Sequence, residues 1–154
     1  MVDNFEYQKE NLAVAAKYLG NMGLSFEIQD LKLLGQTYPA LVFHHSVLGK
    51  HWKVYVLAKD VGVPYFNIKA LITTYDRLRS GENRLTDIYK ECLVANFVFD
   101  EVTFSADPSG SLWAEVDVPV QSDELTFKLE VESIATAIEY FVTKIAKKYQ
   151  IAFN

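Results

Sequence analysis

The fold is decided by the stretch Ala40-Leu-Val-Phe-His-His-Ser46, which is followed, after a connection containing Gly49-Lys50, by Trp52-Lys-Val-Tyr-Val-Leu57. Both runs consist mainly of β-branched, aromatic and other residues that favour strands. A short connection containing glycine between two such runs predicts a β-hairpin. The centre of the chain is therefore expected to form an antiparallel sheet.

Further segments with strand character lie on both sides of this hairpin. Leu24, Phe26 and Ile28 alternate with polar residues in the period of two that is typical of a half-buried strand. Between two later strands, Asp107-Pro-Ser-Gly110 predicts a turn, because proline presets φ and glycine tolerates positive φ. The other expected strands are Leu31 to Tyr38 (strand with a turn), Tyr65 to Tyr75, Val102 to Phe104 and Leu112 to Val118.

Three segments have helical periodicity. The first runs from about Asn4 to Met22, and Asp3 followed by Glu6 resembles a capping box at its start. The second runs from about Leu85 to Phe97. Its apolar stripe consists of Leu85, Ile88, Cys92 and Ala95.

The third helical segment is ambiguous at its start. Leu125, Phe127, Leu129 and Val131 alternate as they would in a strand, so a short strand before a helix from Glu132 is one alternative. The spacing of three and four is sustained further, up to Tyr149. It therefore favours one helix from about Asp123 or Thr126 to Tyr149.

The order of these segments predicts an α+β fold. Strands linked by hairpins, with few helices between them, argue against a doubly wound parallel sheet. We expect an antiparallel sheet covered on one face by about three helices, in the order α-β-β-β(-β)-α-β-β-α. With 154 residues, the chain is expected to be a single domain spanning 1–154.

Composition restricts the class of protein. Half of the residues are hydrophobic and 21 are aromatic (2 Trp, 9 Tyr and 10 Phe), which excludes a disordered chain. A single cysteine excludes a disulfide scaffold and favours the cytoplasm. With 20 acidic residues against 15 basic ones, nucleic acid is not an expected partner. The N-terminus has no secretory signal pattern and no segment has the length of a membrane span, so no membrane association is expected.

No catalytic, cofactor or metal site is predicted. His44 and His45 are adjacent in a strand and so point to opposite faces, which prevents both from binding one metal ion. His51 could approach one of them across the hairpin, but two histidines with no carboxylate in register are weak evidence for a metal site. Cys92 lies on an apolar stripe and is expected to be buried and structural. Glu115 and Asp117 share a strand face with Trp113, and that face is expected to be exposed to solvent; neither they nor Asp100 and Glu101 define a pocket.

The surplus of aromatic residues is the most informative feature. Most aromatic side chains are needed for a core, but several large residues fall on otherwise polar faces. Trp and Tyr in such places are typical of protein interfaces. The candidate interface residues are Trp52, Tyr89, Leu93, Phe97 and Trp113.

Residues 95–149 resemble the YbjN-like family, which shares its fold with the class I type III secretion chaperones. The resemblance is carried by Ala95-Asn96 closing a helix, by Val102-Thr-Phe-Ser-Ala-Asp-Pro-Ser-Gly110, by Leu112-Trp-Ala-Glu-Val-Asp-Val-Pro119 and by the closing helix with Tyr140. The N-terminal half matches only in the order of its elements. The resemblance implies a small, acidic, cytoplasmic, non-enzymatic protein that is often a homodimer, and a chaperone role is an analogy of fold.

The sequence therefore predicts a non-enzymatic protein-binding domain, chaperone-like or regulatory. It is expected to form a homodimer and to capture a partner segment on an apolar patch or sheet edge. The alternative is a small-molecule-binding domain or small enzyme with a pocket between sheet and helices.

Overall fold

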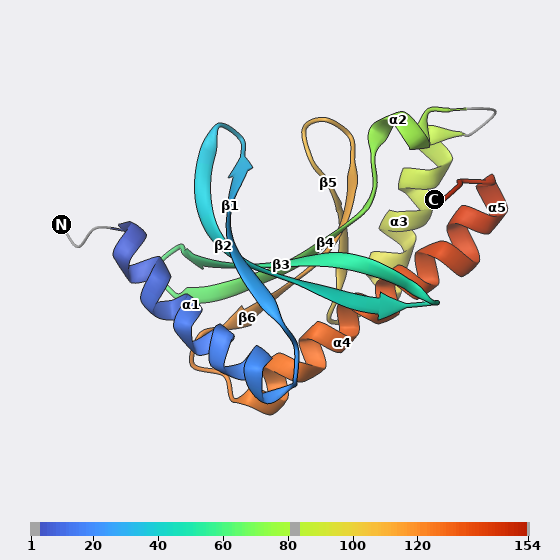
Figure 1. Cartoon of the computed structure of the whole chain (residues 1–154). Coiled ribbons are helices and arrows are strands. Elements are labelled where there is room, and N and C mark those ends of the chain that lie inside the picture. Colours follow the sequence, from blue (N-terminus) through green and yellow to red (C-terminus); the bar gives the residue numbers. More distant parts are fainter. Residues whose placement is uncertain (1–3, 81–83, 154) are drawn as a thin grey trace.

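The protein is described by a computed structural model that covers residues 4–80 and 84–153, with side chains from residue 8 onward. The capping box predicted from Asp3 and Glu6 lies outside the described residues and side chains. Within the described chain, six strands form one antiparallel sheet in the order β1-β2-β3-β4-β6-β5 (Figure 1). The elements are α1 (Asn4–Asn21), β1 (Phe26–Leu33), β2 (Gln36–Val47), β3 (Lys50–Asp60), β4 (Pro64–Thr73), α2 (Tyr75–Leu78), α3 (Leu85–Val98), β5 (Thr103–Ala106), β6 (Leu112–Pro119), α4 (Glu124–Tyr140), the π-helical segment η1 (Phe141–Ala146) and α5 (Lys147–Tyr149).

The predicted α+β fold is confirmed, and so is the central hairpin. β2 and β3 pair from Ala40↔Leu57 to Val47↔Lys50. The turn between them is Leu48-Gly49, and both residues have positive φ (53° and 73°). Two consecutive residues of this kind match the right-handed twist of the flanking strands.

One face of the sheet carries the core. On β3, Val54, Val56 and Ala58 are buried and belong to the main hydrophobic cluster, as their alternation predicts. α1 and α4 lie against this face, and α3 lies at the β5 end of the sheet (Figure 1). The face opposite α1 and α4 is called the open face below.

The closing helix is also as predicted, so the alternative of a strand at 125–131 is wrong. α4 begins after Asp123, whose carboxylate accepts a hydrogen bond from the Thr126 amide at 2.8 Å. Phe127 and Val131 are fully buried, whereas Leu125 and Leu129 are exposed. The four alternating residues therefore belong to two faces of one helix, with Phe127 and Val131 on the buried face and Leu125 and Leu129 on the exposed face.

Several strand boundaries differ from the prediction, and two of these differences have a clear physical reason. β2 begins at Gln36, so Pro39 lies inside a strand. Proline is tolerated there because the pairing with β3 begins only at Ala40. Tyr75, expected to end a strand, instead begins α2, since β4 stops at Thr73 after an irregular register at Leu71.

Candidate functional site

The structure brings together only two of the five predicted interface residues. Leu93 and Phe97 are one helical turn apart on α3 and are both exposed, Phe97 to 92%. Tyr89 lies one turn before Leu93 on the same helix but is half-buried, whereas Trp52 and Trp113 lie on strands and are also at least partly buried.

Trp113 lies on the open face, as its alternation predicts, but it is only 8% exposed. The hairpin tips of β1–β2 and β5–β6 both project on this side of the sheet (Figure 1). Residues from both tips, such as Leu34 and Pro108, line a hollow of about 460 Å³ together with Trp113. The expectation of a solvent-exposed face is thus wrong at this residue, because the sheet curves around it.

Asp107 holds the turn between β5 and β6. One carboxylate oxygen accepts hydrogen bonds from the amide of Ser109 (2.9 Å), the hydroxyl of Ser109 (2.5 Å) and the amide of Ser111 (3.1 Å). The other accepts from the indole N–H of Trp113 at 2.9 Å. Burial opposes the charged form, but the hydrogen bonds from Ser109 and Trp113 outweigh it, and the pKa of Asp107 lies below its usual value.

Tyr89 closes the same turn from the side of α3. Its hydroxyl donates to the carbonyl oxygen of Gly110 at 2.6 Å. Gly110 has a φ of +85°, and a Cβ there would lie 2.7 Å from the ring of Tyr75. The residues that carry the YbjN-like resemblance here therefore have a structural role in this chain.

The exposed side of α3 carries a continuous apolar surface. Four large apolar side chains form two adjacent i, i+4 pairs on the side away from the buried stripe. We call this surface the α3 stripe. It consists of Leu93, Val94, Phe97 and Val98, exposed to 68%, 58%, 92% and 70%.

Each end of the α3 stripe borders a hollow. At one end, Val94 lines a hollow of about 370 Å³ together with Lys90 and Tyr149. At the other end, Val98 lines one of about 410 Å³ with Leu129 of α4, which is itself exposed. Apolar projections and adjacent hollows thus share one surface.

The two edges of the sheet are protected. At β5, the side-chain amide of Asn96 donates to the carbonyl of Phe104 (2.8 Å) and accepts from the amide of Phe104 (2.6 Å). The side chain thereby takes the place of a neighbouring strand. At the other edge, β1 carries Glu27, Asp30 and Lys32, and charges of this kind discourage strand addition.

The open face carries an ion pair in which the charges of Lys69 and Glu115 neutralise one another. Lys69 and Glu115, on the neighbouring strands β4 and β6, are 3.0 Å apart, and the Lys69 ammonium lies 5.3 Å from the ring centre of Trp113. Burial raises the pKa of Glu115, but the charge and hydrogen bond of Lys69, together with the Ser105 hydrogen bond and the charge of Lys59, outweigh burial, so the pKa lies below its usual value. Burial and the charge of Lys69 lower the pKa of Lys59.

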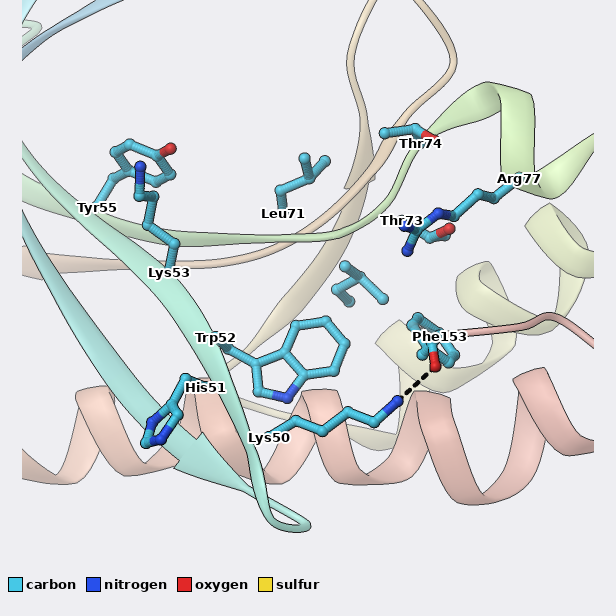
Figure 2. Close-up of a pocket in the computed structure, with 11 residues that line it drawn as sticks. Lys50, His51, Trp52, Lys53, Tyr55, Leu71, Thr73, Thr74, Arg77 and Phe153 are labelled. Atoms are coloured by element: carbon cyan, nitrogen blue, oxygen red, sulfur yellow. Dashed lines mark hydrogen bonds between the residues drawn. The ribbon is translucent and has the colours of Figure 1, made fainter.

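A cavity of about 560 Å³ opens where β3 and β4 separate (Figure 2). The two strands pair from Asp60↔Pro64 up to Val54↔Ala70. Beyond that point residues 50–53 pair with β2, whereas residues 71–73 pair with β6. We call the cavity the fork pocket. The lining residues that matter below are Lys50, Trp52, Lys53, Thr73, Arg77 and Phe153.

The remaining sequence candidates have ordinary environments. Among the described residues, no group of three or more His, Cys, Asp and Glu side chains could hold a metal ion. Cys92 is buried, and burial, followed by the charge of Glu91, raises the pKa of its thiol to about 12. Asp117 accepts a hydrogen bond from buried Asn67 at 2.8 Å. No helix in the described part of the chain is both long and apolar enough to cross a membrane.

Sequence reasoning missed some of these residues for different reasons. Val94 and Val98 were detectable, because they fall opposite the stripe that contains Ile88 and Cys92. Lys50, Arg77 and Phe153 carry no common signal, since 27 and 76 positions separate them along the chain. Only the tertiary structure brings them to one cavity.

Comparisons with known proteins give likenesses to solved structures and no match by sequence. No family model matches the chain, and no curated protein matches it by sequence. One similar solved structure is that of the Yersinia pestis type III secretion chaperone SycH in complex with a stable fragment of YscM2. It has 11% sequence identity and a TM-score of 0.49, covering 83% of this chain and 96% of that chain. Membership of the YbjN-like family stays a prediction.

Proposed function

We propose that this protein is a non-enzymatic, cytoplasmic protein-binding domain that forms a homodimer through the α3 stripe. The observation that carries the proposal is Phe97, an aromatic residue exposed to 92% in the middle of three other exposed apolar residues. Large exposed apolar patches are typical of protein contact surfaces. The protected edges at Asn96 and on β1 favour this apolar patch over strand addition.

The shape of the surface suits a second copy of the same chain. In a twofold arrangement a surface must complement itself. The α3 stripe supplies both projecting side chains, chiefly Phe97, and the hollows bordered by Val94 and by Val98 and Leu129. Two such stripes can therefore interdigitate.

The charges near the stripe favour an antiparallel arrangement of the two helices. Lys90 lies at one end of the stripe, and Asp100 and Glu101 lie just beyond the other end. Antiparallel packing about the centre of the stripe places Lys90 of one copy near the acidic pair of the other. It also places Phe97 of one copy beside Val94 of the other. Opposite charges at the rim of an interface favour one orientation over others.

The oligomeric state tests the proposal. We expect light scattering to give twice the mass of the chain for the wild type, and a monomer for Phe97→Glu, because a charge would be buried against apolar side chains. The matched control is Val61→Glu, which places the same charge on an apolar residue exposed to 82% in the turn between β3 and β4. The control is expected to remain a dimer.

Two results would overturn the dimer. One is a wild type that stays monomeric at about 100 μM, a concentration well above that needed for most specific dimers. The other is a Phe97→Glu variant that keeps the dimer mass while circular dichroism shows the wild-type fold. Either result would leave the α3 stripe as a contact for a different protein.

A pocket between sheet and helices receives no support. Phe127, Val131, Ile134 and Phe141 of the closing helix are fully buried against the sheet. The cavities described above lie on other surfaces of the molecule. This arrangement argues against the alternative of a ligand site inside the sheet–helix interface.

A further inference from the structure

The fork pocket has the size of a small-molecule site. Its volume of about 560 Å³ lies within the range of known ligand pockets, roughly 300–1,000 Å³. Its wall is formed by residues of β3 and β4, by Arg77 of α2 and by Phe153 (Figure 2). Segments that lie far apart in the sequence thus enclose one space.

One wall of the pocket is apolar and aromatic. The rings of Trp52 and Phe153 lie 5.6 Å apart, edge to face. Leu71 and Ile72 of β4 continue the surface. A flat apolar group of a ligand can pack on such a wall, because it buries area on large apolar rings.

The polar side chains that line the pocket supply many donors and few acceptors. Lys50 and Lys53 both line it, and a lysine ammonium group only donates. No aspartate, glutamate, asparagine or glutamine is among its described lining residues. One hydrogen of the Lys50 ammonium is already used by the carbonyl of Phe153, at 2.5 Å. A complementary ligand therefore presents hydrogen-bond acceptors.

Thr73 places a buried hydroxyl in the wall of the pocket. The residue is only 2% exposed, and its hydroxyl has no hydrogen-bond partner among the described residues. The indole nitrogen of Trp52 is likewise buried without a partner. Buried polar groups without partners are uncommon and require an explanation. An acceptor atom on a ligand in the pocket explains the Thr73 hydroxyl.

The cationic side chains of the pocket do not require that this acceptor be an anion. Arg77 already has an interaction within the chain. Lys50 and Lys53 are exposed, so solvent screens their charges. The Thr73 hydroxyl is itself neutral, and a neutral carbonyl oxygen is sufficient to accept its hydrogen bond.

We propose that the fork pocket binds a small, uncharged aromatic carbonyl compound. The carbonyl oxygen accepts a hydrogen bond from the hydroxyl of Thr73, and the flat ring packs on Trp52 and Phe153. The open-face hollow is less suited to this role, because the indole of Trp113 already donates to Asp107. The site is separate from the α3 stripe and does not depend on the proposed dimer.

The test compares 1-indanone with indane, which has the same fused rings but no carbonyl oxygen. The chain has two tryptophans, Trp52 in the fork pocket and Trp113 on the open face, so their indole N–H signals in nitrogen–proton correlation spectra report on separate sites. We expect 1-indanone to shift the Trp52 signal in a saturable way and to leave that of Trp113 in place. Indane is the more hydrophobic probe, so a pocket that recognises only apolar surface binds it more tightly. We expect the opposite order of affinity.

A variant without the hydroxyl completes the experiment. Thr73→Val keeps the shape of the side chain, and its urea midpoint is expected to equal or exceed that of the wild type, because the lost hydroxyl has no partner in the chain. The dissociation constant for 1-indanone is expected to rise about fivefold, the equivalent of one neutral hydrogen bond, while that for indane stays within about twofold. The matched control is Thr37→Val, at an exposed position of β2, which should bind both probes as the wild type does.

Four results would overturn the proposal. The first is the absence of a saturable shift of Trp52 at millimolar 1-indanone. The second is tighter binding of indane than of 1-indanone by the wild type, a comparison that does not depend on the folding of any variant. The third is a Thr73→Val variant that binds 1-indanone as tightly as the wild type does. The fourth is an equal, saturable shift of Trp113, which would place the probe in the open-face hollow.

Discussion

At the scale of single residues, Asp107 has the most concentrated structural role. Its carboxylate accepts four hydrogen bonds from Ser109, Ser111 and Trp113, so this one side chain fixes a turn and a buried indole together. The sequence predicted the turn from Pro108 and Gly110. It did not indicate that Asp107 also holds Trp113.

Replacing Asp107 tests this role. Asp107→Ala leaves the Trp113 indole N–H and two amides without their acceptor, and we expect the free energy of unfolding to fall by about 2–3 kcal/mol. Urea denaturation monitored by tryptophan fluorescence measures this change. Asp30→Ala, which removes an exposed carboxylate on β1, is the control and should change stability by less than about 0.5 kcal/mol. A loss no larger in Asp107→Ala than in the control contradicts the assignment.

At the scale of elements, the closing helix shows how far periodicity can be trusted. The spacing from Phe127 through Ile134 and Phe141 predicted one helix, and the structure confirms it. The same spacing could not reveal the π-helical turn at Phe141–Ala146. There, the wider turn allows both Ile145 and Ala146 to be buried. Such a local change of helical pitch depends on how the helix packs against the sheet, so it cannot be predicted from the spacing of apolar residues.

The start of that helix gives a prediction of its own. Asp123→Ala removes the acceptor of the Thr126 amide, and we expect the free energy of unfolding to fall, because the first turn of α4 loses its cap. Thermal or urea denaturation followed by circular dichroism at 222 nm measures the change. Asp123→Asn retains an oxygen acceptor at the same place and should keep most of the stability. Equal losses in both variants would show that the capping hydrogen bond contributes little.

At the scale of the whole molecule, stability depends on pH through two glutamates whose pKa values are shifted in opposite directions by folding. The pKa of Glu115 is lowered in the fold from its ordinary value of 4.5, so its contribution is present above that pH and is lost as the pH falls through the lower folded value. The pKa of Glu130 is raised by burial and by the charge of Glu101. Its charged form therefore opposes folding at neutral pH.

Two variants test the opposite effects of these glutamates on stability. At pH 7, Glu115→Gln is expected to lower the free energy of unfolding by about 1–2 kcal/mol, because Lys69, whose side chain is only 11% exposed, loses its partner. Glu130→Gln is expected to raise it slightly, by a few tenths of a kcal/mol. Below pH 4.5 the curve of Glu115→Gln should approach that of the wild type. Urea midpoints between pH 7 and pH 3 at one protein concentration measure both, and a pH-independent difference for Glu115→Gln would refute the coupling.

The order of strands and helices, the central hairpin and the long closing helix were determined by the sequence, because local periodicity, turn residues and capping act over a few positions. Tertiary structure alone decided the environment of Trp113, which strand alternation predicted to be exposed. The curvature of the sheet, set by the packing of all six strands on their helices, brings distant hairpin tips around it. The α3 stripe depends on both. Its apolar residues can be identified from the sequence, but their exposure depends on what α3 packs against. The fork pocket depends on tertiary structure altogether, since Lys50, Arg77 and Phe153 meet only where two central strands separate.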